Sequence, residues 1–187
     1  MKRSLSHTLA LVGLGLATFA VTPAHAQTTG VGPYYATPSW DQTLPSNTRF
    51  IVLSNFAGAA VLDRETGLVW EKTLEVITLR WFEAQATCLS KNVGGRGGWK
   101  LPSIQELRSL MDPTVPFPGP ALPAGHPFVG VQSSGSQPTP YWTSTTFSNN
   151  VSQAWFMDSD DGSAGILDKS LKAYYWCTRG GSGVDVQ

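Results

Sequence analysis

Short runs of apolar, β-branched and aromatic residues, bounded by polar or turn-forming residues, recur along the chain and are typical of strands. Six segments have this pattern: residues 50–53, 59–63, 68–71, 141–145, 154–158 and 174–179. A turn at 64–67 makes a hairpin of residues 63–70, and Asp160-Asp161-Gly162 predicts a second turn. Antiparallel strands are therefore expected in both halves of the chain.

Two segments between these strands have the three-to-four-residue apolar spacing of helices. The first takes Thr78 as its N-cap, and its apolar face comprises Trp81, Ala84, Cys88 and Leu89. The second begins at Ser103, which forms a capping box with Glu106. Its apolar stripe comprises Ile104, Leu107, Leu110 and Met111, and Asp112-Pro113 ends it. The pattern predicts an α+β fold with two helices packed on antiparallel strands.

Two loops are the expected ligand-binding surface. The first loop, residues 113–140, contains eight of the 13 prolines, and the second, residues 94–100, overlaps a glycine-rich segment at 92–98. Long loops without secondary structure are typical of functional or mobile segments, and a rigid scaffold commonly presents binding residues on its loops.

The first 26 residues have the features of a secretory signal peptide. Basic Lys2 and Arg3 precede an apolar run, and Ala24-His25-Ala26 forms a cleavage site. The run is too short to span a membrane, so no span is expected after cleavage. We predict an exported protein, periplasmic or extracellular, with an N-terminal arm or linker at 27–47, a folded domain at 48–182 and a tail at 183–187.

The two cysteines, Cys88 and Cys177, are expected to pair because an exported chain folds in an oxidising compartment. The alternatives are a thiol nucleophile and a metal-binding pair. Neither cysteine has a neighbouring histidine, a C-x-x-C spacing or a cationic cluster that would favour those roles.

Charge and composition narrow the class of partner. The formal net charge of +0 gives no basic field for nucleic acid. The chain's one basic cluster is a candidate site for a sulfated or carboxylated glycan, although scattered charge on a solvated loop explains it equally. The tentative ligand-binding residues are Lys91, Arg96, Lys100, Arg108 and His126, the last being the one histidine after signal cleavage.

Acidic and aromatic residues have structural as well as functional interpretations. Weak calcium candidates are Asp158, Asp160 and Asp161, but their spacing does not match an EF-hand and suits a hairpin turn. Paired glycosidase carboxylates would come from Glu71, Glu75, Glu83 or Glu106, whose mutual distances the sequence does not give. Six tryptophans are expected in the core: Trp70, Trp81, Trp99, Trp142, Trp155 and Trp176. No cofactor motif is present.

Four motifs occur in the order typical of one family. They are DRETGLVW at 63–70, GGWKLPSIQEL at 97–107, YWTST at 141–145 and WCTRGG at 176–181. The chain resembles the Lcl C-terminal domain family, which takes its name from the Legionella collagen-like adhesin. The resemblance implies a C-type-lectin-like fold with a disulfide from a helix to the last strand. The calcium-binding triplets of sugar-binding C-type lectins are absent.

The expected function is an exported, non-catalytic recognition module at the bacterial cell envelope, with a glycan or other cell-surface ligand. One alternative is an enzyme related to the formylglycine-generating proteins, which share a similar helix start and need reactive thiols. Another is a structural protein of envelope assembly that docks a partner on the arm around Trp40. The sequence indicates no oligomeric state.

Overall fold

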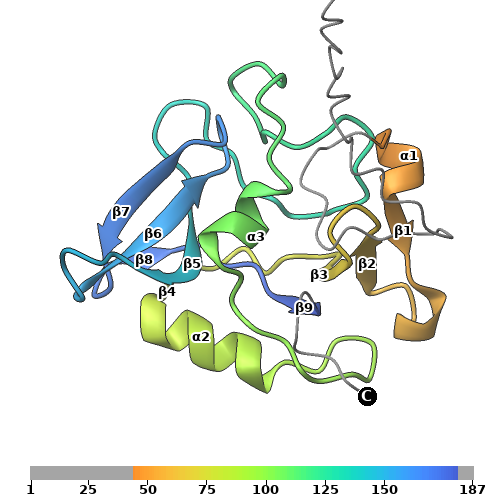
Figure 1. The fold of residues 1–187 in the computed structure, drawn as a ribbon, viewed down its shortest axis with the longest axis horizontal. Coiled ribbons are helices and arrows are strands. Elements are labelled where there is room, and N and C mark those ends of the chain that lie inside the picture. The colour runs from red at the N-terminus through yellow and green to blue at the C-terminus, as the bar shows by residue number, and fades with distance from the viewer. Residues whose placement is uncertain (1–43, 181–187) are drawn as a thin grey trace, which may run out of the picture. The chain divides into compact units, whose positions relative to one another are not determined.

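The computed structural model describes residues 44–180, and these form a mixed α+β fold made mostly of strands (Figure 1). The predicted signal peptide, most of the predicted arm with Trp40, and the tail lie outside the described residues. The helices are α1 (Ser46–Arg49), the 3-10 helix η1 (Ser54–Phe56), α2 (Trp81–Ser90) and α3 (Ile104–Arg108). The strands are β1 (Phe50–Val52), β2 (Ala60–Asp63), β3 (Leu68–Glu71), β4 (Leu79–Arg80), β5 (Pro140–Thr146), β6 (Gln153–Asp158), β7 (Ala164–Asp168), β8 (Lys172–Ala173) and β9 (Thr178–Gly180).

The strands form three antiparallel sheets. The four-stranded sheet has the order β1-β2-β3-β9, the three-stranded sheet has the order β5-β6-β7, and β4 pairs with β8. The predicted hairpin at 63–70 is confirmed by the β2–β3 register, in which Val61 opposes Trp70. Because β9 pairs with β3, the end of the described chain lies beside strands formed by its beginning.

The strand predictions differ from the structure in two ways. The segment 174–179 is interrupted, because the Tyr174 N–H donates to the Pro140 carbonyl while the Cys177 N–H donates to the Glu71 carboxylate. Strands β4, β7 and β8 were not predicted, because β4 and β8 have two residues each and no residue of β7 is fully buried. In β7, Gly165 lies under the Phe156 ring, where a Cβ would come within 2.5 Å of Cζ.

The two predicted helices are present with different ends. Helix α2 starts after Arg80, not at Thr78, because residues 79 and 80 pair with β8. Leu89, predicted on the buried face, is 70% exposed, since it lies about 100° around the helix from Cys88. The Ser103–Glu106 capping box of α3 is confirmed, with both reciprocal hydrogen bonds formed. That helix ends at Arg108, so the buried Leu110 and Met111 lie beyond it.

The core consists of two apolar clusters joined through the sheets. One includes Leu107 of α3 with Trp70 and Trp176, and Figure 1 shows α3 between the three-stranded and four-stranded sheets. The other lies under α2 and includes Trp99 and Trp142. Core burial is confirmed for five of the six tryptophans, whereas Trp155 is half-buried against the Phe147 ring.

The disulfide between Cys88 and Cys177 is confirmed. Both residues are fully buried, and the bond joins α2 to the residue that precedes β9. The alternative roles as free thiol nucleophile and metal pair are therefore wrong for this structure. Within residues 44–180, no helix is both long and apolar enough to cross a bilayer.

Candidate functional site

A pocket of about 450 Å³ opens beside the disulfide. It lies where the chain leaving β3 passes the end of α2, and its size is within the range of small-molecule sites. The residues that line it are Ala59, Glu71, Thr73, Glu75, Lys91, Asn92, Val93 and Gly94. Most of these side chains are polar, and Ala59 and Val93 add apolar surface, a combination suited to directional binding of a polar ligand.

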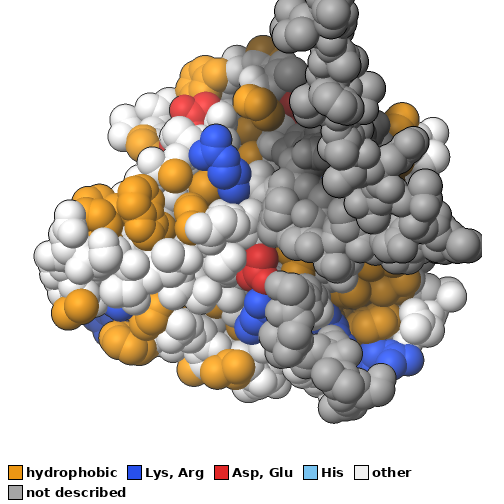
Figure 2. Space-filling view, in the orientation of Figure 1, with side chains coloured by type: hydrophobic (Ala, Val, Ile, Leu, Met, Phe, Trp, Pro, Cys, Tyr) orange, Lys and Arg blue, Asp and Glu red, His pale blue; other side chains and the backbone are white. Residues whose placement is uncertain are grey.

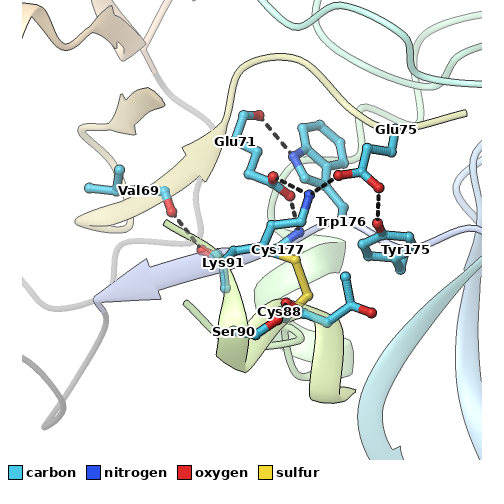
Figure 3. Close-up of a disulfide and its surroundings, with 11 residues drawn as sticks. Val69, Glu71, Glu75, Cys88, Ser90, Lys91, Tyr175, Trp176 and Cys177 are labelled. Atoms are coloured by element: carbon cyan, nitrogen blue, oxygen red, sulfur yellow. Dashed lines mark hydrogen bonds and ion pairs between the residues drawn. A yellow bond between two sulfur atoms is a disulfide. The ribbon is translucent and has the colours of Figure 1, made fainter. Parts of the chain in front are cut away.

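Two carboxylates and one ammonium form the charged part of the pocket (Figure 3). The Lys91 Nζ lies 2.6 Å from Glu71 Oε1 and 3.0 Å from Glu75 Oε1. Glu71 is the last residue of β3, and Lys91 follows the last residue of α2. Glu75 is 53% exposed, while the Lys91 side chain is 11% exposed. The accessible charge of the pocket is therefore mainly the Glu75 carboxylate.

The segment that carries Cys177 completes this arrangement from the other side. The Tyr175 hydroxyl donates to Glu75 Oε2 at 2.6 Å, and the Cys177 N–H donates to Glu71 Oε2 at 3.0 Å. The Trp176 indole N–H donates to the Glu71 carbonyl at 3.0 Å. On the other side, the Lys91 N–H donates to the Cys88 carbonyl. The disulfide thus joins the two segments that hold the pocket carboxylates.

Burial and these contacts shift the pKa values of the cluster. Burial raises the pKa of Glu71, outweighing the lowering effect of Lys91 and of the Cys177 N–H. The hydrogen bonds from Tyr175 and Lys91 lower the pKa of Glu75. Burial acts to lower the pKa of Lys91, but its contacts with Glu71 and Glu75 dominate and raise it. Burial and the Glu75 contact raise the pKa of Tyr175. At neutral pH the pocket holds a neutral phenol, a charged Lys91 and an ionised Glu75.

Glycine is required at the wall of the pocket. Gly94 has φ of +60°, and a Cβ there would lie 2.3 Å from the Phe56 carbonyl oxygen. Any side chain at this position would push the loop away from η1. The glycine-rich segment therefore has a defined packing role at this residue.

The predicted basic residues do not form one open cationic surface. Lys91 is held by Glu71 and Glu75, and Lys100 pairs with Glu106 at 2.6 Å. Arg96 lies over the Phe56 ring and donates to the Asn55 carbonyl. Arg108 is exposed on α3. Binding of an anionic glycan by these residues stays a prediction.

The predicted acidic and histidine candidates have structural contacts in the fold. Asp160 accepts from the Ser133 hydroxyl at 2.6 Å and from the Thr139 hydroxyl at 2.9 Å, and Asp158 accepts from the Thr139 N–H at 3.0 Å. Through these bonds the two aspartates hold the end of the 113–140 loop, whereas Asp161 accepts from the Ser163 N–H.

His126 accepts from the Phe128 N–H, and burial lowers its pKa. Over residues 44–180 no group of three or more His, Cys, Asp or Glu side chains is placed to hold a metal ion. Calcium binding at the Asp160 turn and ligand binding by His126 stay predictions.

A family model for the Lcl C-terminal domain matches residues 59–179, which is more than half of the chain. The chain belongs to the Lcl C-terminal domain family. The match covers every residue that lines the pocket and both cysteines of the disulfide. No curated protein matches the chain.

The pocket of this Lcl C-terminal domain was only partly visible in the sequence. Glu71 and Glu75 were candidates for paired carboxylates, and Lys91 was a candidate ligand residue, but nothing placed them together. Tyr175 was missed because it lies in an aromatic run that predicts only burial. The one usable signal was the pairing of Cys88 with Cys177, which brings Lys91 and Tyr175 close because each lies within three residues of a cysteine.

Replacing Tyr175 with phenylalanine is expected to raise the pKa of Glu75. The Tyr175 hydroxyl is the largest cause of the lowered value, and phenylalanine cannot donate. A lowered folded-state pKa stabilises the fold above the ordinary carboxyl pKa, and that contribution is lost as the pH falls. Tyr175→Phe should therefore lose less stability on acidification than the wild type.

Carbon-13 NMR titration of the Glu75 carboxyl measures this shift directly. Tyr174→Phe is the matched control, because no described residue hydrogen-bonds with the Tyr174 hydroxyl. An unchanged Glu75 pKa in Tyr175→Phe would contradict the assigned role of the hydroxyl.

Proposed function

We propose that this protein is an exported, non-catalytic recognition module of C-type-lectin-like architecture that binds a glycan at the bacterial cell envelope. The observation that carries the proposal is the polar pocket of about 450 Å³ at Glu71, Glu75 and Lys91, which the disulfide supports from two sides. Membership in a family named for an adhesin is consistent with recognition of a surface ligand.

The lining of the pocket favours binding through hydrogen bonds rather than through a hydrophobic patch. Only 14% of the chain is charged, and Figure 2 shows apolar side chains scattered among uncharged ones, with few charged groups, on the face in view. The pocket instead gathers the ionisable side chains of Glu71, Glu75 and Lys91 beside the polar side chains of Thr73 and Asn92. Closely spaced polar groups of this kind are suited to a ligand rich in hydroxyl groups.

The enzyme alternative has less support. An enzyme of the formylglycine-generating kind needs reactive thiols, and both cysteines of this chain are joined in the buried disulfide. Thiol titration of the native protein tests this point: a non-catalytic module shows no reactive thiol before denaturation and reduction. The assembly alternative depends on the arm around Trp40, and its test is whether deletion of 27–47 abolishes association with the envelope.

Two measurements test the proposal itself. The intact mass of protein recovered from its host should show loss of residues 1–26, and retention of that segment would contradict export. The mature chain is applied to an array of bacterial and host glycans. It should bind at least one glycan saturably, and the mass of the bound glycan should stay unchanged. Binding to none of them would contradict glycan recognition, and a changed ligand mass would indicate an enzyme.

A further inference from the structure

We infer that the pocket at Glu71, Glu75 and Lys91 binds an uncharged sugar ring through adjacent hydroxyl groups and disfavours sulfated or carboxylated glycans. This inference rests on the proposed function and names the ligand class of the same site. It differs from the expectation drawn from the basic residues in the sequence, which favoured an anionic glycan.

The charges of the pocket disfavour an anionic ligand. Among the described residues that line it, Lys91 is the one basic residue, and Glu71 and Glu75 are the acidic residues. Lys91 Nζ already contacts both carboxylates, at 2.6 Å and 3.0 Å. A sulfate or carboxylate entering the pocket would therefore meet the exposed Glu75 carboxylate without a free ammonium to offset the repulsion.

The hydrogen-bonding groups of the pocket match the hydroxyl groups of a sugar. An ionised carboxylate has about four acceptor positions, and each Glu75 oxygen receives one hydrogen bond in the structure. Asn92 and Thr73 are exposed at the pocket, and no described residue hydrogen-bonds with either side chain. A sugar hydroxyl both donates and accepts, so adjacent hydroxyls match a carboxylate acceptor beside an amide and a hydroxyl.

The pre-organised Glu75 carboxylate and the shape of the pocket also favour a sugar ring. Tyr175 and Lys91 fix the two Glu75 oxygens before any ligand arrives, which reduces the entropy lost on binding. Ala59 and Val93 add apolar surface for the C–H groups of a sugar ring. The Gly94 contact with Phe56 holds the wall of the pocket in place. The volume of about 450 Å³ accommodates a sugar ring with its neighbouring linkages.

The experiment compares matched neutral and charged glycans. Oligosaccharides ending in glucose, galactose, mannose or fucose are titrated into the mature protein calorimetrically, each beside its sulfated counterpart, together with sialylated chains. We expect at least one neutral ligand to bind, with its sulfated counterpart at least about tenfold weaker. Glu75→Gln should weaken binding of the neutral ligand at least about tenfold, because hydrogen bonds to a charged acceptor are strong.

The control variant is Glu83→Gln, which removes an exposed carboxylate on α2 outside the pocket and should leave the dissociation constant unchanged. The thermal midpoint of each variant reports folding, and Asn92→Ala, on an exposed loop, replaces Glu75→Gln if that variant does not fold.

One result would overturn this inference and leave the proposed function standing. In it, the protein prefers sulfated glycans, Glu75→Gln leaves their binding unchanged, and Lys100→Gln or Arg96→Gln abolishes it. Binding of no glycan by the wild type overturns both.

Discussion

Replacing Cys88 and Cys177 together with alanine is expected to lower the free energy of unfolding by about 4–5 kcal/mol, the largest effect of any change considered for this protein. The bond joins residues separated by 89 positions, so its loss frees a long loop in the unfolded ensemble. Both sulfur atoms are buried in the cluster under α2, and small alanine side chains also leave unfilled volume there.

Urea unfolding of the oxidised wild type and of the double variant measures this difference. Reduction of the wild type should give a loss of similar size, because it removes the same cross-link without changing the sequence. The variant should also lose affinity for any pocket ligand, since Lys91 and Tyr175 are positioned from the two ends of the bond. A loss of less than about 1 kcal/mol would contradict the role of the disulfide as a main stabilising link.

Replacing Arg49 with methionine is expected to destabilise the fold by about 3–5 kcal/mol, because it leaves buried carboxylates without their cation. Arg49 Nε and Nη2 donate to the two Asp63 oxygens at 2.9 Å and 2.8 Å, and Nη2 also donates to the Ser109 carbonyl at 2.6 Å. Glu65 Oε2 lies 3.2 Å from Arg49 Nε. The arginine thereby ties the end of α1 to β2 and to the residue that follows α3.

The matched control for this prediction is Arg80→Met. Arg80 lies 3.7 Å from Glu83, and both side chains are about half exposed, so its loss should cost less than about 1 kcal/mol. Chemical unfolding of both variants in one buffer gives the comparison. Equal effects of the two substitutions would contradict the assignment of Arg49 as a buried structural cation.

The sequence predicted the local elements better than their ends. Short apolar runs identified the strands of both main sheets except β7, and the Ser103–Glu106 box located the start of α3, because these signals act over a few residues. The start of α2 was misplaced because Thr78 is a good N-cap by itself. Pairing of β4 with β8, from a segment more than 90 positions away, decides that end and leaves no local signal.

The candidate site was less predictable than the fold. The basic residues were grouped because they are near one another in the sequence, whereas the structure gives Lys91 and Lys100 separate acidic partners from other elements. The buried Arg49–Asp63 pair was missed for a related reason: charged residues next to a predicted strand are usually exposed. Contacts between segments distant in the sequence determine the partners of the two lysines and the burial of the Arg49–Asp63 pair. Neither residue spacing nor composition encodes such contacts directly.

The central claim is that the ligand binds in the pocket beside the disulfide. It is tested most directly by recording nitrogen-15 NMR spectra of the mature protein while a bound neutral oligosaccharide is titrated. We predict saturable shifts concentrated at residues 71, 73, 75 and 91–94, which line the pocket. Shifts confined to the 113–140 loop, or to Lys100 and Arg108, would place the ligand elsewhere and contradict the claim.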